Sequence, residues 1–190
     1  MRTTPEAITR FWLEAVGPAG WFASDSALDA EIARRFGLAA RMARLGAFRA
    51  WAGDADAALA LLILLDQFPR NLHRGAPLAF AADPRARRVA RAALARGFDL
   101  ARAGDARLLF LLPFEHSESL ADQDRAVRLV AARLPARRDY LRHARAHRDV
   151  IRRFGRFPFR NDALARPWTE AERAWVEAGG YLAELARQPA

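Results

Sequence analysis

Two short polar segments of the sequence have the same order of side chains, FPRN at 68–71 and FPFRN at 157–161. In both, an aromatic residue and a proline come first, and an arginine and an asparagine come last. The planar guanidinium of arginine suits carboxylate and phosphate groups, and an asparagine amide both donates and accepts hydrogen bonds. One interpretation is therefore a groove that binds an anion, lined by the arginines Arg70, Arg74, Arg156 and Arg160.

The alternative interpretation is that these arginines only hold helix ends together. Asp66, Glu115 and Glu118 are the acidic residues that could pair with them. Because a charge buried in a protein needs a partner, such ion pairs would serve the fold and leave no groove. The two interpretations differ in what the guanidinium groups contact, a ligand or the protein itself.

A second polar segment, EHSE at 115–118, places carboxylates beside a histidine. Such groups could act as acid and base, or as oxygen and nitrogen ligands of a metal. Ser117 and His116 do not form a catalytic pair, because neighbours along the chain point apart. A serine–histidine partnership would need His147 or His73 to approach through space. Acidic residues also accumulate at helix starts, where they complement the helix dipole, so a structural role is the simpler interpretation.

His143 and His147 lie one helical turn apart, a spacing that can hold zinc. The residues between them are Ala-Arg-Ala, so no acid is present to act as a base. Two histidines on an arginine-rich helix are usually surface or hydrogen-bonded residues. We expect no metal site and no cofactor.

The element that must position FPRN is an apolar run over residues 57–65, which leads into Asp66 and Gln67. A helix that is apolar on every side is buried in the middle of a domain. Pro69 lacks an N–H and disfavours helical geometry at the preceding residue, so this helix is expected to stop or kink there. The buried helix would then deliver a carboxylate, an amide and a guanidinium to the edge of the core.

Helix signals occur along the rest of the chain, and no window alternates as a strand does. The helix starts are marked by Thr4 with Pro5, Ser26 with Asp29, Asp54 or Asp56, Asp83 with Pro84, Asp105, and Thr169 with Glu172. The helix that Asp105 would cap is expected over 108–112, and further helices are expected over 120–134 and from Pro135 to a stop at Gly155. These signals predict an all-α fold of about eight helices, stacked as antiparallel pairs in one domain over residues 1–190.

The composition excludes several classes of protein. The chain has 190 residues and no cysteine, which excludes disulfides and thiolate metal sites. The net charge is +9 and every basic residue is arginine, but acids are mixed among the arginines and no groove-reading motif is present. We therefore expect no nucleic-acid binding. The apolar run is half of the ~20 residues that a membrane helix needs, and no secretory signal is visible. We expect a cytoplasmic protein, no membrane partner and, given the tryptophans, a possible homodimer.

Several motifs together resemble a mainly bacterial family, the domain of unknown function nine-two-four. They are FWLEAVG at 11–17 with Trp21, LLDQFPRN at 64–71, ADP at 82–84, EHSE at 115–118 and HRDVIRRFGRFPFRN at 147–161. The resemblance covers most of the chain. It implies a helical fold similar to tetratricopeptide repeats, without clear repeats in the sequence. Because the family has no established activity, the resemblance assigns no catalytic residues.

The positions that match the motifs of the family are the candidate ligand-binding residues. These are Asp66, Gln67, Arg70, Asn71, Arg74, His116, Ser117, Glu118, His147, Arg148, Arg156, Arg160 and Asn161. The chain departs from the family at Phe159, where a histidine is usual, and at Ala165, where a glycine is expected. If the family used that histidine in catalysis, this member would be impaired.

Three functions follow from these observations. The first is a binding module that captures a peptide or a small anionic ligand on the motif arginines and asparagines. The second is a hydrolase that uses His116 or His147 with Glu118 or Asp66. The third is a purely structural polar network at the helix ends. The sequence favours binding over catalysis.

Overall fold

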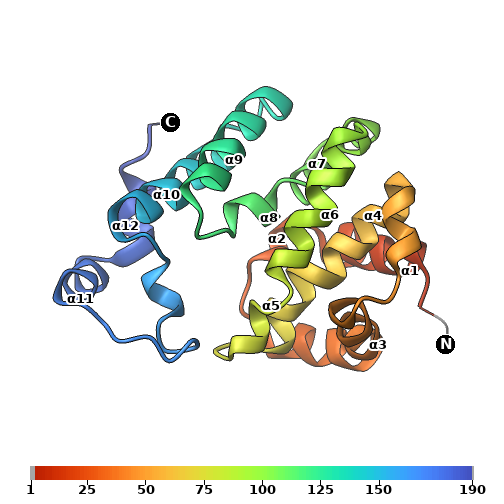
Figure 1. The fold of residues 1–190 in the computed structure, drawn as a ribbon, viewed down its shortest axis with the longest axis horizontal. Coiled ribbons are helices and arrows are strands. Elements are labelled where there is room, and N and C mark those ends of the chain that lie inside the picture. The colour runs from red at the N-terminus through yellow and green to blue at the C-terminus, as the bar shows by residue number, and fades with distance from the viewer. Residues whose placement is uncertain (1–2, 190) are drawn as a thin grey trace. The chain divides into compact units, whose positions relative to one another are not determined.

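The computed structural model describes residues 3–189, which form helices joined by short connections and contain no strand (Figure 1). The predicted all-α fold is confirmed. The chain divides into two compact units, Met1–Pro113 and Phe114–Ala190, here called the N-terminal and C-terminal units. Each is described separately, and the predicted single domain stays a prediction.

The helices of the N-terminal unit surround one buried helix. They are α1 (Pro5–Arg10), α2 (Gly17–Trp21), α3 (Ser26–Leu45), α4 (Ala55–Leu62), α5 (Phe68–Leu72), α6 (Asp83–Ala95) and α7 (Asp105–Leu108). Five shorter turns lie between them, the π-helical turns Phe11–Val16 and Ile63–Gln67 and the 3₁₀ turns Arg49–Gly53, Pro77–Ala79 and Phe98–Ala101. The helices α1 and α6 pack against α4, and α3 packs against α5.

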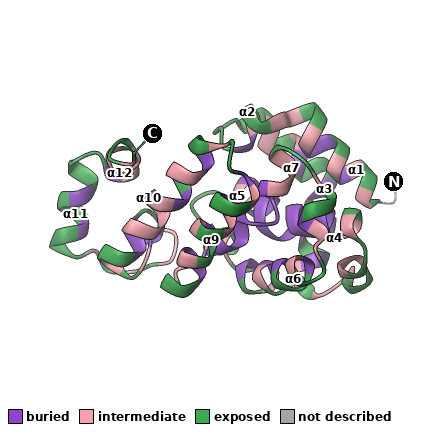
Figure 2. Ribbon diagram, turned by 90° about the horizontal axis from the view of Figure 1, so that it is seen from above, coloured by how far each residue is buried: buried purple, intermediate pink, exposed green. Residues whose placement is uncertain are grey.

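The helix α4 is the predicted central helix. Asp54 is its N-cap and accepts hydrogen bonds from the N–H groups of Asp56 and Ala57, at 3.0 and 2.9 Å. All residues from 58 to 69 are buried, and Figure 2 shows the buried colour concentrated here. An uninterrupted apolar sequence therefore does form the core of the unit.

Of the stop or kink predicted at Pro69, the stop is wrong. Helical structure continues through Pro69 to Leu72, and the break in α-helical hydrogen bonding comes earlier, in the π-helical turn Ile63–Gln67. After that turn, Pro69 lies in the first turn of α5, where its missing N–H costs nothing. The wider π-helical turn before Pro69 thus allows the helical structure to continue past the proline.

Aromatic rings fill the space around Phe68. Its ring centroid lies 5.2 Å from that of Phe36, stacked, and 5.3 Å from that of Trp12, edge to face. Trp21 donates from its indole nitrogen to the carbonyl of Trp12 at 2.7 Å. Trp12 and Trp21 are therefore core residues.

The C-terminal unit is built on a helical hairpin. Its helices are α8 (Leu112–Glu115), which begins at the end of the N-terminal unit, α9 (Leu120–Arg133), α10 (Arg138–Phe154), α11 (Glu170–Glu177) and α12 (Gly180–Ala186), with a 3₁₀ turn at Pro158–Arg160. The helices α9 and α12 both pack against α10. A core cluster consists of Val150, Ile151, Phe157 and Trp175.

Local helix signals hold in this unit and at the end of the N-terminal unit, with two exceptions. Gly155 ends α10 with a φ of 69°, and Thr169 and Glu172 form a capping box at α11, as predicted. The helix predicted over 108–112 is replaced by a turn between α7 and α8, with Pro113 in the first turn of α8. The sequence does not predict α12, because this helix is short, follows Gly179 and begins at a second glycine, Gly180.

Three predicted helix starts are also corrected. Asp105 is the first residue of α7 and not its cap, because the N-cap is Gly104. Asp25, not Ser26, caps α3, because its carboxylate accepts from the N–H groups of Ala27 and Leu28. Asp83 does not cap α6 and instead binds Arg70. Within residues 3–189, no helix is both long and apolar enough to cross a lipid bilayer.

Candidate functional site

Arg70 lies between two buried carboxylates in the N-terminal unit. Its guanidinium donates to both oxygens of Asp83, at 3.2 and 3.1 Å, and lies 3.5 Å from Asp66. The exposed fractions of Asp66 and Asp83 are only 1% and 5%. Burial lowers the pKa of Arg70, but the charges of Asp66 and Asp83 outweigh it and raise the pKa overall. The predicted ligand-binding arginine thus contacts two acidic side chains of the chain itself.

Asn71 and Arg74 converge on one carboxylate, that of Asp29 on α3. Asn71 donates its amide to Asp29 at 2.8 Å, and Arg74 donates to both carboxylate oxygens at 2.5 and 2.9 Å. The hydrogen bond from Arg74 is the main cause of a lowered pKa of Asp29. Gln67 donates to Asp66 in the same region. The contacts of Asn71 and Arg74 with Asp29 connect the end of α5 to the start of α3.

The remaining motif residues lie in the C-terminal unit, where Glu172 joins two of them. Arg156 donates to both oxygens of Glu172, at 2.6 and 2.9 Å, and to the carbonyl of Pro167. The amide of Asn161 also donates to Glu172, at 3.3 Å. The arginine bond, before all other causes, lowers the pKa of Glu172 to about 2. The sequence identified Glu172 only as a helix cap.

Glu118 forms a second junction of the same kind. It accepts from the N–H of Phe157 at 2.9 Å and from Arg166 at 2.8 and 2.7 Å. Burial raises the pKa of Glu118, but these hydrogen bonds outweigh it and lower the pKa. Arg166 was missed in the sequence, because nothing local distinguishes it from other arginines.

Ser117 and Arg160 hold the segment between α8 and α9. The Ser117 hydroxyl donates to Asp122 at 2.9 Å and accepts from the N–H of Ser119. Arg160 donates to the carbonyl of His116 at 3.0 Å and lies over the ring of Phe157. The Ser117 hydroxyl thus bonds to a carboxylate and a backbone N–H. Arg148 contacts Asp149, its neighbour, at 3.4 Å.

His147 lies in a different environment, near Tyr181 and Glu115, which the sequence did not associate with it. Its Nδ1 atom is 3.0 Å from the carbonyl of His143, 3.4 Å from the hydroxyl of Tyr181 and 3.6 Å from the carboxylate of Glu115. The His116 ring lies edge-on to it, with centroids 6.4 Å apart. Tyr181 follows a pair of glycines, a context that gives no signal for a site.

Two groups of motif residues therefore exist, Asp66 to Arg74 in the first unit and His116 to Asn161 in the second. Arg70, Arg74 and Arg156 each bind a carboxylate of the chain. Such pairs favour the structural interpretation of these arginines. Ligand binding by these arginines stays a prediction. The single groove lined by arginines of both groups also stays a prediction. Within residues 3–189, no cluster of three or more acidic or histidine side chains could hold a metal ion.

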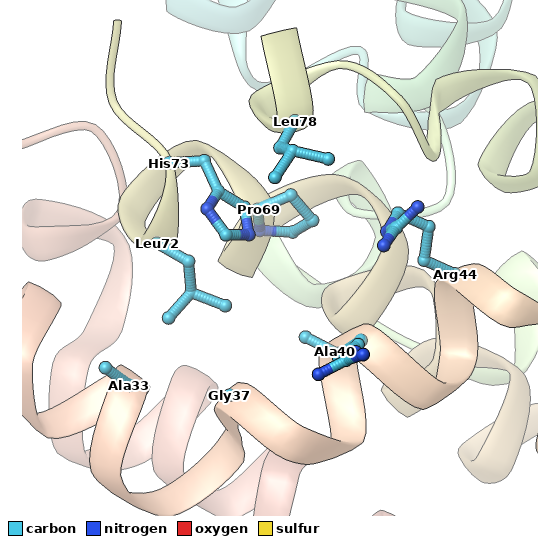
Figure 3. Close-up of a pocket in the computed structure, with 9 residues that line it drawn as sticks. Ala33, Gly37, Ala40, Arg44, Pro69, Leu72, His73 and Leu78 are labelled. Atoms are coloured by element: carbon cyan, nitrogen blue, oxygen red, sulfur yellow. The ribbon is translucent and has the colours of Figure 1, made fainter. Parts of the chain in front are cut away.

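A pocket of about 500 Å³ opens between α3 and α5 of the N-terminal unit. We call it the α3–α5 pocket. Its apolar lining consists of Ala33, Gly37, Ala40, Pro69, Leu72 and Leu78, and its basic lining consists of Arg41, Arg44 and His73. Figure 3 shows Gly37 and Ala40 on α3 facing Pro69 and Leu72 of α5, with Arg44 at one side.

The basic side chains of this pocket differ from the motif arginines. Neither Arg41 nor Arg44 has a side-chain hydrogen bond or ion pair with any part of the chain that the structure describes. Arg41 is exposed and Arg44 is half-buried. Two guanidinium groups one turn apart are therefore available to an anion at the mouth of an apolar pocket.

Comparisons with known proteins give the same fold and no activity. A family model described as a bacterial protein of unknown function, DUF924, matches residues 8–180. A solved structure of a protein of unknown function from Agrobacterium tumefaciens is 44% identical, with a TM-score of 0.87, covering 92% of this chain and 97% of the other. No curated protein is similar enough to match.

Proposed function

Since the chain belongs to DUF924, a family of bacterial proteins of unknown function, we propose a function from the geometry of the N-terminal unit. The protein binds a small anion with a short apolar chain, such as an aliphatic carboxylate, in the α3–α5 pocket. This proposal keeps the binding module expected from the sequence but assigns the anion to Arg41 and Arg44. A tetratricopeptide-like stacking of the helices stays a prediction of the resemblance.

The observation that carries the proposal is the contrast between paired and unpaired arginines. Arg70 and Arg74 are neutralised by Asp83 and Asp29. Arg41 and Arg44 have no such carboxylate in residues 3–189. A charge-assisted hydrogen bond contributes roughly 1.5–3 kcal/mol, so two guanidinium groups together provide a selective anchor for a carboxylate or a phosphate.

The apolar wall determines the rest of the ligand. Leu72 of α5 faces the small residue Gly37 on α3, which leaves room for an alkyl chain. Leu78 of the following 3₁₀ turn also lines the pocket. Each methylene removed from water contributes about 0.8 kcal/mol. The pocket of about 500 Å³ accommodates a chain of several carbons. The ligand class is therefore an amphiphilic anion and not a bare inorganic ion.

Two motif residues that do not line this pocket connect its two helices. Asn71 and Arg74 bind Asp29, which fixes the end of α5 against α3. His73 lines the pocket and lies between these two residues in the sequence. The network would thus set the width of the pocket without contacting the ligand. The hydrolase expected from His116 or His147 with Glu118 or Asp66 has no such support, because Glu118 and Asp66 contact arginines.

Hexanoate is the probe that tests the proposal. At a concentration about a hundred times its Kd, a ligand of the folded state adds roughly 2.7 kcal/mol of stability, which is expected to raise the Tm by several degrees. Hexan-1-ol lacks the charge and acetate lacks the chain, so each is expected to bind at least about tenfold more weakly. Titration calorimetry measures the affinities directly.

Replacing Arg41 and Arg44 together with glutamine is expected to abolish discrimination between hexanoate and hexan-1-ol. The matched control is Arg34→Gln, which removes one exposed charge from α3 two turns before Arg41. This control is expected to bind hexanoate as the wild type does. Equal binding of hexanoate by the double variant would contradict the proposal.

A further inference from the structure

We propose that the C-terminal unit contains a separate site, in which His147 accepts the hydroxyl proton of a small hydroxy-aromatic ligand held by Phe159, Trp175 and Tyr181. Nothing in this proposal depends on the anion site of the N-terminal unit. It rests on the tautomer of His147, on a buried carboxylate beside it, and on a pocket that is lined by His147 and by aromatic rings.

The surroundings of His147 determine which ring nitrogen carries the proton. The carbonyl of His143 lies 3.0 Å from Nδ1, and a carbonyl can only accept a hydrogen bond. The contact is a hydrogen bond only if Nδ1 bears the hydrogen. The neutral ring then has its lone pair on Nε2, which has no hydrogen bond within residues 3–189. Nε2 is therefore a free proton acceptor.

Tyr181 and His143 are consistent with this assignment. The Tyr181 hydroxyl lies 2.9 Å from Nδ1 of His143 and 3.4 Å from Nδ1 of His147. Burial, and then the charge of Glu115, raises the pKa of Tyr181, so its hydroxyl keeps its proton. Burial, followed by the nearby His147, lowers the pKa of His143, which can accept that proton in a hydrogen bond. The tyrosine oxygen remains available to the N–H of His147.

Glu115 supplies the charge that a protonated His147 needs. Its side chain is only 2% exposed, and one carboxylate oxygen has no hydrogen-bond partner in the described structure. The other oxygen lies 3.6 Å from Nδ1 of His147, too far for a direct hydrogen bond but near enough for a strong attraction to an imidazolium. A buried, incompletely satisfied carboxylate is costly for folding alone, which points to a role in the site.

The pocket beside His147 defines the ligand. It has a volume of about 430 Å³ and is lined by His147, Phe159, Trp175, Val176, Gly179, Gly180 and Tyr181. Phe159 and Val176 are about half exposed, at 50% and 46%, although both are apolar. Aromatic walls favour a flat ring, and the free acceptor on His147 favours a ligand with one hydroxyl donor. A phenol has both features.

The proton transfer needs no further reactant. The O–H bond of the bound phenol breaks, its electron pair stays on the oxygen, and an N–H bond forms at Nε2 of His147. The resulting imidazolium lies between the phenolate and the carboxylate of Glu115. The product is a bound phenolate, a better nucleophile than the phenol, and the proton returns when the ligand leaves.

The probe for this site is 4-nitrophenol, whose anion absorbs visible light. Wild-type protein is expected to bind it at least about tenfold more tightly than nitrobenzene, which lacks the hydroxyl, and to increase the absorption of the anion at fixed pH. His147→Gln is expected to bind the two probes equally, with no change in absorption. Arg145→Gln, a charge change elsewhere on α10, is the matched control and is expected to behave as the wild type does.

Nitrogen NMR of the histidine rings tests the assignment without any substitution. Neutral His147 is expected in the form with hydrogen on Nδ1, so the test survives even if His147→Gln fails to fold. Hydrogen on Nε2 in the free protein would overturn the proposal. So would equal affinity of the wild type for 4-nitrophenol and nitrobenzene.

Discussion

Arg70→Met is expected to lower the free energy of unfolding by about 4 kcal/mol, because removing one partner of a buried ion pair costs roughly 3–5 kcal/mol. The carboxylates of Asp66 and Asp83 are almost fully buried and both lie within 4 Å of this guanidinium. Methionine fills much of the space but supplies no charge. Urea denaturation, followed by a probe in the N-terminal unit, measures the change.

Three further variants distinguish structure from ligand binding at this position. Arg70→Lys is expected to recover part of the stability, since an ammonium keeps the charge but cannot form the bidentate contact with Asp83. Adding Asp66→Asn and Asp83→Asn to Arg70→Met is expected to recover part of it too, because the two negative charges that Arg70 contacts are then also removed. Arg34→Gln is expected to change stability by less than about 0.5 kcal/mol. A stable Arg70→Met protein that has lost hexanoate binding would instead support the groove predicted from the sequence.

The sequence predicts those parts of the fold that depend on neighbouring residues. Asp54 caps α4, Gly155 ends α10, and Thr169 with Glu172 caps α11, because caps and stops are formed by residues a few positions apart. The buried central helix is predicted for a similar reason, since its apolar character is uninterrupted over residues 57–65.

The sequence does not reveal where a helix widens. The rule that proline ends a helix fails at Pro69, because the π-helical turn Ile63–Gln67 precedes it. Such a turn has no residue type of its own and arises from the packing around it. The same limit applies to Asp83. Because a proline follows it, Asp83 has the local pattern of a helix cap, but its carboxylate binds Arg70 instead.

The partners of the candidate site residues are harder still to predict. Arg74 binds Asp29, 45 residues away, and Arg166 binds Glu118, 48 residues away. In a chain with 31 basic and 22 acidic residues, charge alone allows many such pairs. Local spacing therefore identifies polar segments correctly but cannot distinguish an arginine that binds a carboxylate of the chain from one that is free for a ligand.

Glu172→Gln is expected to lower the free energy of unfolding by about 2 kcal/mol at neutral pH, mainly through the weakened bidentate bond from Arg156. The pKa of Glu172 is lowered from 4.5 to about 2 in the folded protein. The side chain of Arg156 is 26% exposed, and solvent screening reduces the effect below that of a fully buried pair. Chemical denaturation at neutral pH gives the difference.

The pH dependence of that difference identifies its cause. Because the folded-state pKa is lowered, the stabilisation by the charge is complete above pH 4.5, decreases as the pH falls, and is lost as the pH passes through about 2. The stability difference between wild type and Glu172→Gln is therefore expected to shrink over this range. Glu177→Gln, on the exposed face of the same helix, is expected to leave stability within about 0.5 kcal/mol of the wild type at each pH. A difference for Glu172→Gln that does not change with pH would mean that the shape of the side chain, and not its charge, stabilises the junction of Arg156, Asn161 and α11.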